Sequence, residues 1–275
     1  RTQPPMQSNE LAQIIKARDG EQAIGKAQEK AKELKEMQGD SATALSLLTA
    51  VRDYTAKYIR RAGQSFSNLT KEDYLSPDKV LEVGYANDFD YAFLQYIMLK
   101  ELGLEPRLLL GISKLRASSP EKLISTCILT DVDLVLVEVE IDGKKYYPNI
   151  GSQYAIEMSL TPKYCGVPLF DRDAAMFVKS YSDTFPLKQS KGETHTHLVV
   201  DIDREGMATI SNETSYSGQN LEPFVSMFSE LLPELRERHH AQLVGQYGRS
   251  ANAIGDLEVD IASIPATEEY KLRME

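Results

Sequence analysis

Tryptophan is absent from this sequence of 275 residues, and it contains only two cysteines and four histidines. The two cysteines, Cys127 and Cys165, do not make a disulfide framework, although a single bond between them stays open. Without a Cys-x-x-Cys pair, and with the histidines in two close pairs, a zinc site has little support. Cys127 lies in an apolar run and is expected to be buried. Cys165 follows Pro162 in a loop and is the more reactive-looking thiol.

Long apolar runs and a leader segment are also missing. No stretch of about 18 apolar residues occurs, so membrane insertion is not expected in this segment. The chain begins Arg1-Thr2-Gln3, without an initiator Met, and we expect a processed protein or a piece of a longer parent chain with neighbouring domains. Its formal net charge of −10 repels nucleic-acid phosphates and anionic lipids, which disfavours both as partners.

The composition is that of a globular protein, and the chain changes character along its length. Residues 1–40 are rich in Ala, Lys, Glu and Gln and are expected to form an N-terminal helical arm, either solvated or packed by one narrow stripe. Residues 41–185 carry helices and then strands, and are expected to form one domain. Residues 186–275 are expected to form a smaller β-rich domain with a helical segment.

The segment Ala86–Arg107 is the most informative part of the first domain. It predicts a polar turn and then a strongly apolar helix, with Gly103 at its end and Pro106 just beyond. Strands follow, first over Arg107–Leu115 and then in an apolar run that ends at Asp142-Gly143, a strong hairpin signal. Helices followed by antiparallel strands indicate an α+β fold.

The last part of the chain predicts a second set of elements. Leu198–Ile202 alternates as a strand does, and a polar turn leads to a returning strand. A helical stretch over Leu221–Val244 is expected to break at Pro233. Leu257–Ile264 predicts a final strand.

The helix Ala86–Gly103 and the hairpin Leu134–Asn149 together resemble the transglutaminase-like superfamily, which has the papain-like cysteine protease fold. The chain is most similar to bacterial multidomain proteins in which a β-rich domain of unknown function follows such a core. The resemblance implies helices packed on an antiparallel sheet, and a catalytic Cys, His and Asp at Asp88, at or next to Leu134, and at Asn149. It also implies an extracytoplasmic location, periplasmic or at the cell surface.

All three positions depart from the family pattern. A Cys-His-Asp site needs a thiolate, a base and a group that orients the base. Leu134 can neither accept nor donate a proton, Asp88 is a weak acyl nucleophile, and Asn149 has no His to orient. We therefore expect no active catalytic residues here, and we expect a pseudoenzyme that binds a protein, peptide or glycan ligand or that acts as a scaffold. No cofactor is expected.

Two other functions stay open at this stage. One is an active cysteine-type hydrolase or acyl-transferase with a rearranged site, in which Cys165 would be the relocated nucleophile. The other is a structural module stabilised by a metal on clustered carboxylates, of which helix capping and solvation are the simpler explanations. A ligand cleft of the pseudoenzyme would be lined by Tyr85, Asp88, Asp90, Tyr91, Asp133 and Tyr147, and the metal cluster would combine Asp88, Asp90 and Asp133 with Asp131.

The histidines also have a simple explanation. His195 and His197 alternate on one predicted strand and share one of its faces, where two imidazoles without a visible third ligand indicate an exposed strand edge. His239 and His240 lie near a helix end, where a structural role is expected.

Overall fold

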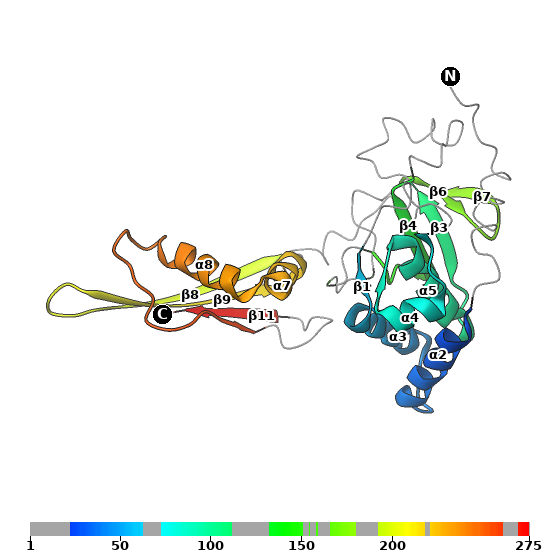
Figure 1. Ribbon diagram of the computed structural model, residues 1–275, viewed down its shortest axis with the longest axis horizontal. Coiled ribbons are helices and arrows are strands. Elements are labelled where there is room, and N and C mark those ends of the chain that lie inside the picture. Colours follow the sequence, from blue (N-terminus) through cyan, green and yellow to red (C-terminus); the bar gives the residue numbers. More distant parts are fainter. Residues whose placement is uncertain are drawn as a thin grey trace, which may run out of the picture. The chain divides into compact units, whose positions relative to one another are not determined.

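The computed structural model describes residues 23–62, 73–111, 132–150, 154, 158, 166–179, 192–217, 221–260 and 269–274. The chain divides into two compact units. The first is Arg1–Gln153 with Glu157–Phe185, and the second is Tyr154–Ile156 with Pro186–Glu275. Both units combine helices with antiparallel sheets (Figure 1), which confirms the α+β class. Within the described part of the chain, no helix is long and apolar enough to span a bilayer.

Helices and an antiparallel sheet make up the first unit. Its helices are α2 (Gly25–Gln38), α3 (Ala44–Tyr58), α4 (Pro77–Val83) and α5 (Asp88–Glu101). Its strands are β1 (Arg60–Arg61), β2 (Tyr85–Ala86), β3 (Arg107–Gly111), β4 (Leu134–Ile141), β5 (Lys144–Tyr146), β6 (Pro168–Asp171) and β7 (Met176–Lys179). The main sheet has the order β5-β4-β3-β6-β7, and β1 and β2 form a separate parallel pair.

Helix α5 is the centre of the first unit. Asn87 caps its start, because the Asn87 side chain accepts a hydrogen bond from the backbone N–H of Asp90 at 2.9 Å. Ten of its 14 residues are buried, against α2, α3 and α4 on some sides and against β3 and β4 on another. Burial of each large apolar side chain stabilises the fold by roughly 1.5–3 kcal/mol. The helix predicted over this segment is confirmed.

Strand β4 is buried on both faces. Val135, Val137 and Val139 pack in the same cluster as the apolar residues of α5, whereas Leu134 and Leu136 belong to a second cluster on the other face. The turn into β5 is Asp142-Gly143, and both residues have positive φ, 52° and 74°. This is the conformation that a two-residue hairpin turn requires, and it confirms the predicted hairpin.

Helix α2 joins the first unit by a narrow stripe. Only Ala27, Ala31 and Leu34 are buried, one or two turns apart on one face, and they pack in the cluster that contains α5. At the end of α5, the carboxylate of Glu101 accepts a hydrogen bond from Gln28 at 2.8 Å and pairs with Lys32 at 3.2 Å. Of the two possibilities for this helix, packing by one stripe is the one observed.

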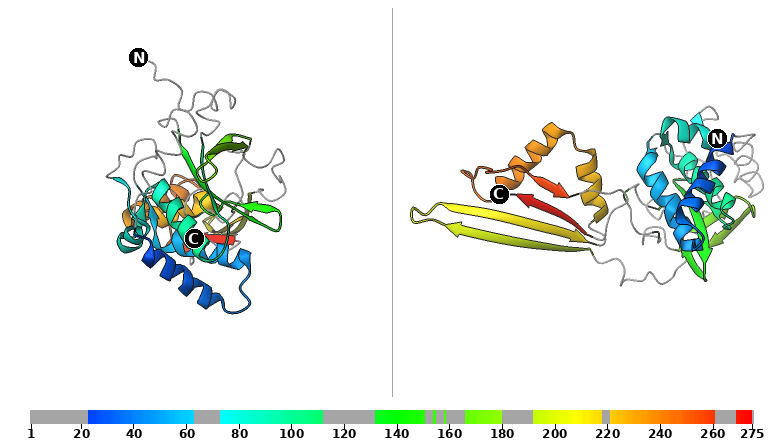
Figure 2. Two further views of the ribbon diagram at one scale, coloured as in Figure 1. Left: turned by 90° about the vertical axis from the view of Figure 1, so that its right-hand side faces the viewer. Right: turned by 90° about the horizontal axis from the view of Figure 1, so that it is seen from below.

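The second unit is a four-stranded antiparallel sheet with two helices. Its elements are β8 (Glu193–Ile202), β9 (Ala208–Ser217), α7 (Leu221–Glu230), α8 (Pro233–Val244), β10 (Glu258–Asp260) and β11 (Glu269–Met274). The strand order is β10-β11-β9-β8, and the two helices lie on one face of this sheet (Figure 2). The predicted break at Pro233 is confirmed. The strand predicted over Leu257–Ile264 is present as β10, but it is not the final strand, because β11 follows it.

Aromatic side chains fill the space between this sheet and α7. The ring of Tyr216 on β9 stacks on Phe224 with centroids 4.4 Å apart, and Phe224 in turn contacts Phe228. Leu272 of β11 belongs to the same cluster. Tyr216 and Leu272 therefore point towards the helices, and the side chains of alternate residues, such as Glu213 and Arg273, point to the opposite face of the sheet.

Candidate functional site at the start of α5

Arg61 and Asp88 meet at the N-terminus of α5. The parallel pair β1–β2 sets Arg61 beside Ala86, two residues before the helix begins. The Arg61 guanidinium donates to Oδ1 of Asp88 from both Nη2, at 2.6 Å, and Nε, at 3.2 Å. A carboxylate here is favoured twice, because the helix N-terminus carries partial positive charge and the guanidinium is a full one.

Arg61 also ties this helix start to the end of the β4–β5 hairpin. Its Nη1 donates to the backbone carbonyl of Asn149 at 3.2 Å, and its guanidinium lies 5.2 Å from the ring centroid of Tyr91. Arg61 therefore contacts two of the three positions that the sequence resemblance singled out, Asp88 and Asn149. The group that links them is an arginine, which cannot act as a base at neutral pH.

Both polar atoms of the Asn149 side chain form hydrogen bonds with the backbone of β4. Its Oδ1 accepts from the backbone N–H of Val137 and its Nδ2 donates to the carbonyl of Val135, both at 2.8 Å. Asn149 is only 4% exposed. The amide thus continues the hydrogen bonding of β4 where β5 has ended, and it is the one side chain of this size with a donor and an acceptor to match both groups.

Leu134, the third position, does not point towards α5. It lies in the second cluster with Leu136, Tyr147 and Ile150. The neighbouring residue on the α5 side of β4 is Val135. Neither the Leu134 nor the Val135 side chain can transfer a proton. The sequence of the first unit contains no histidine at all.

Asp90 lies in the same turn of α5 but points into the protein. It is 2% exposed, and its Oδ2 accepts hydrogen bonds from the backbone N–H of Leu75 at 3.0 Å and from Nδ2 of Asn87 at 2.6 Å. Its Oδ1 has no partner in the described part of the chain. Burial raises the pKa of Asp90 to about 7, against the effect of the two hydrogen bonds, which lower it.

This pKa predicts a pH dependence of stability. From about pH 4 to about pH 7 the folded chain holds a proton on Asp90 that the unfolded chain has lost, so the free energy of unfolding should fall as the pH rises through this window. The total contribution is on the order of 4 kcal/mol. Asp90→Asn removes the titrating group. Urea unfolding of both proteins from about pH 4.5 to about pH 8 should show that the free energy of unfolding of the variant increases relative to that of the wild type as the pH rises. If the free energies of unfolding of the two proteins changed equally with pH, the prediction would be contradicted.

The other residues expected in a ligand cleft differ in their exposure to solvent. Tyr85 is 51% exposed and lies opposite Arg60 in the β1–β2 pair, and Asp133 is half-buried just before β4. Tyr91 and Tyr147 are both 2% exposed, and the Tyr147 hydroxyl donates to Glu138 on the face of the sheet that points away from α5. Neither buried ring is open to a ligand.

Part of the prediction falls on residues that the structure does not describe. Cys165, Cys127 and Asp131 lie outside the described ranges. Among the residues that are described, no three His, Cys, Asp or Glu side chains are placed to hold a metal ion. Asp88 and Asp90 diverge, because Asp88 faces Arg61 and Asp90 faces Leu75 and Asn87.

A charged network that the sequence pattern does not predict lies on the face of the main sheet that points away from α5. Arg107 donates to Asp171 from Nε at 2.8 Å and pairs with Glu138 through Nη1 at 2.9 Å. Lys145 and the Tyr147 hydroxyl also contact Glu138, at 3.1 and 2.7 Å. Both carboxylates are 3% exposed. The four charged side chains of this network come from four different strands. Their pairing therefore depends on the strand order, which the sequence pattern did not reveal.

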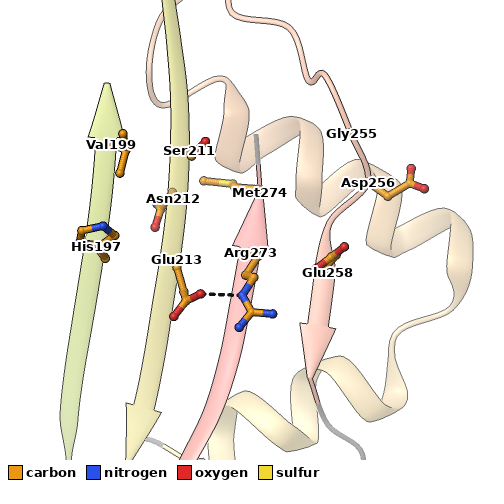
Figure 3. Close-up of a pocket in the computed structure, with 10 residues that line it drawn as sticks. All are labelled: His197, Val199, Ser211, Asn212, Glu213, Gly255, Asp256, Glu258, Arg273 and Met274. Atoms are coloured by element: carbon orange, nitrogen blue, oxygen red, sulfur yellow. Dashed lines mark hydrogen bonds and ion pairs between the residues drawn. The ribbon is translucent and has the colours of Figure 1, made fainter. Parts of the chain in front are cut away.

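A pocket of about 350 Å³ lies on the second unit (Figure 3). Four of its side chains form a row across the sheet, from His197 on β8 through Glu213 and Arg273 to Glu258 on β10. The Arg273 Nε contacts Glu213 at 2.6 Å. Figure 3 shows this row on the face of the sheet opposite to the helices. His195 and His197 are both exposed on β8, in agreement with the interpretation of this segment as an exposed strand edge.

Comparison with known proteins gives the fold of the chain. No family model matches it. A crystal structure from Parabacteroides distasonis ATCC 8503, described as a "putative protease", has a similar fold, with a TM-score of 0.51 and 16% sequence identity over 71% of this chain. The match covers 37% of that protein, so the chain spans well under half of its length. At this identity the likeness concerns the fold alone.

Proposed function

We propose that the chain contains a transglutaminase-like domain that has lost its catalytic residues and serves as a binding or scaffolding module for a protein, peptide or glycan. The observation that carries this proposal is the Arg61–Asp88 ion pair at the start of α5. The family places a thiol at this position. Here a carboxylate occupies it, and a guanidinium holds that carboxylate against the backbone of Asn149.

The chemistry of the surrounding residues supports the same proposal. A thiolate mechanism needs an imidazole or a comparable base within hydrogen-bond reach, and the first unit has no histidine in its sequence. An orienting residue must have a free oxygen, and both polar atoms of the Asn149 side chain already bond to β4. The similar fold of a protein described as a protease fits a domain derived from an enzyme.

The surface next to the ion pair would be the ligand-binding part of such a module. Tyr85 and Arg60 are exposed neighbours in the β1–β2 pair, and the side chain of Asp88 is 46% exposed. An aromatic ring with charges of both signs suits a polar ligand with apolar patches, such as a peptide or a glycan. An extracytoplasmic location and attachment to neighbouring domains of a longer chain belong to the same proposal.

A turnover assay tests the proposal against the cysteine-enzyme alternative. Wild-type protein, Asp88→Ala and Cys165→Ala are incubated with a mixed peptide library and with an amine donor, and products are read by mass spectrometry. We expect no peptide cleavage or amide exchange above the buffer control in any sample. Turnover by the wild type that disappears in Cys165→Ala would establish the relocated nucleophile, and loss in Asp88→Ala would assign catalysis to α5.

Asp88→Ala should instead reduce the stability of the folded protein. Loss of a partly exposed ion pair and of a favourable charge at the helix N-terminus should lower the free energy of unfolding by about 1 kcal/mol. Urea unfolding measures this difference. Asp53→Ala, which removes a similar ion pair with Arg52 from within α3, is a control for charge alone. A variant as stable as the wild type would show that the Arg61 contact contributes nothing.

A further inference from the structure

Strand β8 lies at the end of the four-stranded sheet of the second unit. Its inner edge pairs with β9, and no described strand pairs with its outer edge. All ten residues from Glu193 to Ile202 are exposed. Such an edge carries a row of backbone donors and acceptors that another strand can complete, and natural proteins protect long exposed edges of this kind.

In the described structure, the distal half of the β8–β9 hairpin has no third strand beside it. Strand β11 pairs with β9 only from Asn212 to Ser217, so Ala208–Ser211 pair with β8 alone (Figure 1). A two-stranded ribbon is marginally stable in water. Its surface is nevertheless apolar, with Leu198 and Val200 each 46% exposed and Ile202 70% exposed. An apolar strand edge that no described strand covers is typical of an interaction surface.

The sequence of β8 is complementary to itself when two copies run antiparallel about Val199. Counting outwards from that residue, His197 of one copy faces Asp201 of the other, and Leu198 faces Val200. Each imidazole thus meets a carboxylate and each of these apolar residues meets another. Val199, which Figure 3 shows on the same face as His197, would lie opposite its own copy on the two-fold axis.

We propose that the outer edge of β8 is a dimerisation surface, on which a second copy of this chain adds its own β8 antiparallel about Val199. The two four-stranded sheets then join into one continuous sheet through backbone hydrogen bonds between the strands. Cross-strand pairs of imidazole with carboxylate and of apolar residues fix the register. The proposal is independent of the proposed function of the first unit.

Sedimentation velocity on the full chain, from about 1 to about 100 µM, tests the association. The wild type should sediment as a dimer at the upper end of this range. Val199→Lys sets two like charges against each other on the axis and should weaken dimerisation at least tenfold. Ile254→Lys is the matched control, because Ile254 is an exposed apolar residue of the same unit, 69% exposed, that lies outside β8. It should dimerise like the wild type.

A charge exchange tests the register and does not depend on the folding of the lysine variant. His197→Asp sets two carboxylates opposite each other and should weaken the dimer, and adding Asp201→His should restore it, since each pair is then only reversed. Val199→Cys should form a 199–199 disulfide on mild oxidation, identified by peptide mapping, whereas Leu198→Cys should not crosslink to itself. Circular dichroism of each variant checks that the fold is kept.

Two results would overturn the proposal. One is a monomer at every concentration, which would leave the edge to a strand of another protein or of a neighbouring domain. The other is a dimer that Val199→Lys and His197→Asp leave unchanged while both variants stay folded, which would place the dimer contact elsewhere on the chain.

Discussion

Replacing Arg107 with methionine should lower the free energy of unfolding of the first unit by about 3 kcal/mol. Arg107 contacts both Glu138 and Asp171, and each of these carboxylates is 3% exposed. Removing one partner of a buried charge pair leaves the other charge uncompensated in a poorly solvating environment. Lys145 still contacts Glu138, and the backbone N–H groups of Asp173 and Ala174 still contact Asp171, so the loss stays limited.

Hydrogen exchange of peptides from β3 and β4 measures this change in the first unit alone. Arg273→Met is the matched control, because Arg273 pairs with Glu213 on the surface of the second unit and should contribute less than about 1 kcal/mol. Adding Glu138→Gln and Asp171→Asn to the Arg107 variant should recover part of the loss by removing the stranded charges. Equal effects of the Arg107 and Arg273 substitutions would contradict the importance of burial.

Asn149→Asp, which installs the residue that the proposed transglutaminase-like origin expects at this position, should destabilise the first unit by about 3 kcal/mol. The aspartate keeps an acceptor for the N–H of Val137 but turns a second oxygen towards the carbonyl of Val135, where the amide now donates. Two acceptors then face each other in a buried site and one of them carries charge. The loss should shrink at low pH, where the carboxyl group is protonated and can donate again.

Asn149→Ala provides the comparison, because it leaves both backbone groups of β4 without partners, at a cost of about 2–4 kcal/mol. Asn252→Ala is the control, since its side chain makes one exposed hydrogen bond to Ser250, and it should cost less than about 0.5 kcal/mol. Exchange of the Val137 amide in all three variants is the measurement. If Asn149→Asp were as stable as the wild type, the amide would have no structural role, and loss of catalysis would be the only explanation left for it.

The parts of the fold that were predicted from the sequence are those with local signals. An apolar run between Asn87 and Gly103 fixes α5, and Asp142-Gly143 fixes the hairpin, because only a few residues readily adopt positive φ. Pro233 separates α7 from α8 in the same local way. Strand β11 was missed although it completes the order of the second sheet. Its pairing with β9 joins residues far apart in the chain, and that partner is invisible in the sequence.

The candidate site was only partly predictable for the same reason. Asp88 and Asn149 were found by resemblance, but Arg61, which joins them, reaches the site through two-residue strands that carry no periodicity. The face of β4 on which Leu134 lies was also ambiguous. Six of its eight residues are buried, from Leu134 to Val139, and the alternation of polar and apolar residues begins only at Val137, so the run around Leu134 does not itself distinguish the two faces.

The most direct test of the central claim, that this domain has no activated nucleophile, is the rate of alkylation of Cys165 by iodoacetamide as a function of pH in the native protein, with Cys165→Ala to identify the signal. We expect the alkylation rate to rise with pH and to reach half of its maximum at about pH 8.5, as for an ordinary thiol. A fast rate that persists unchanged down to about pH 6 would indicate a thiolate stabilised by neighbouring groups. It would contradict the pseudoenzyme proposal in favour of a cysteine enzyme.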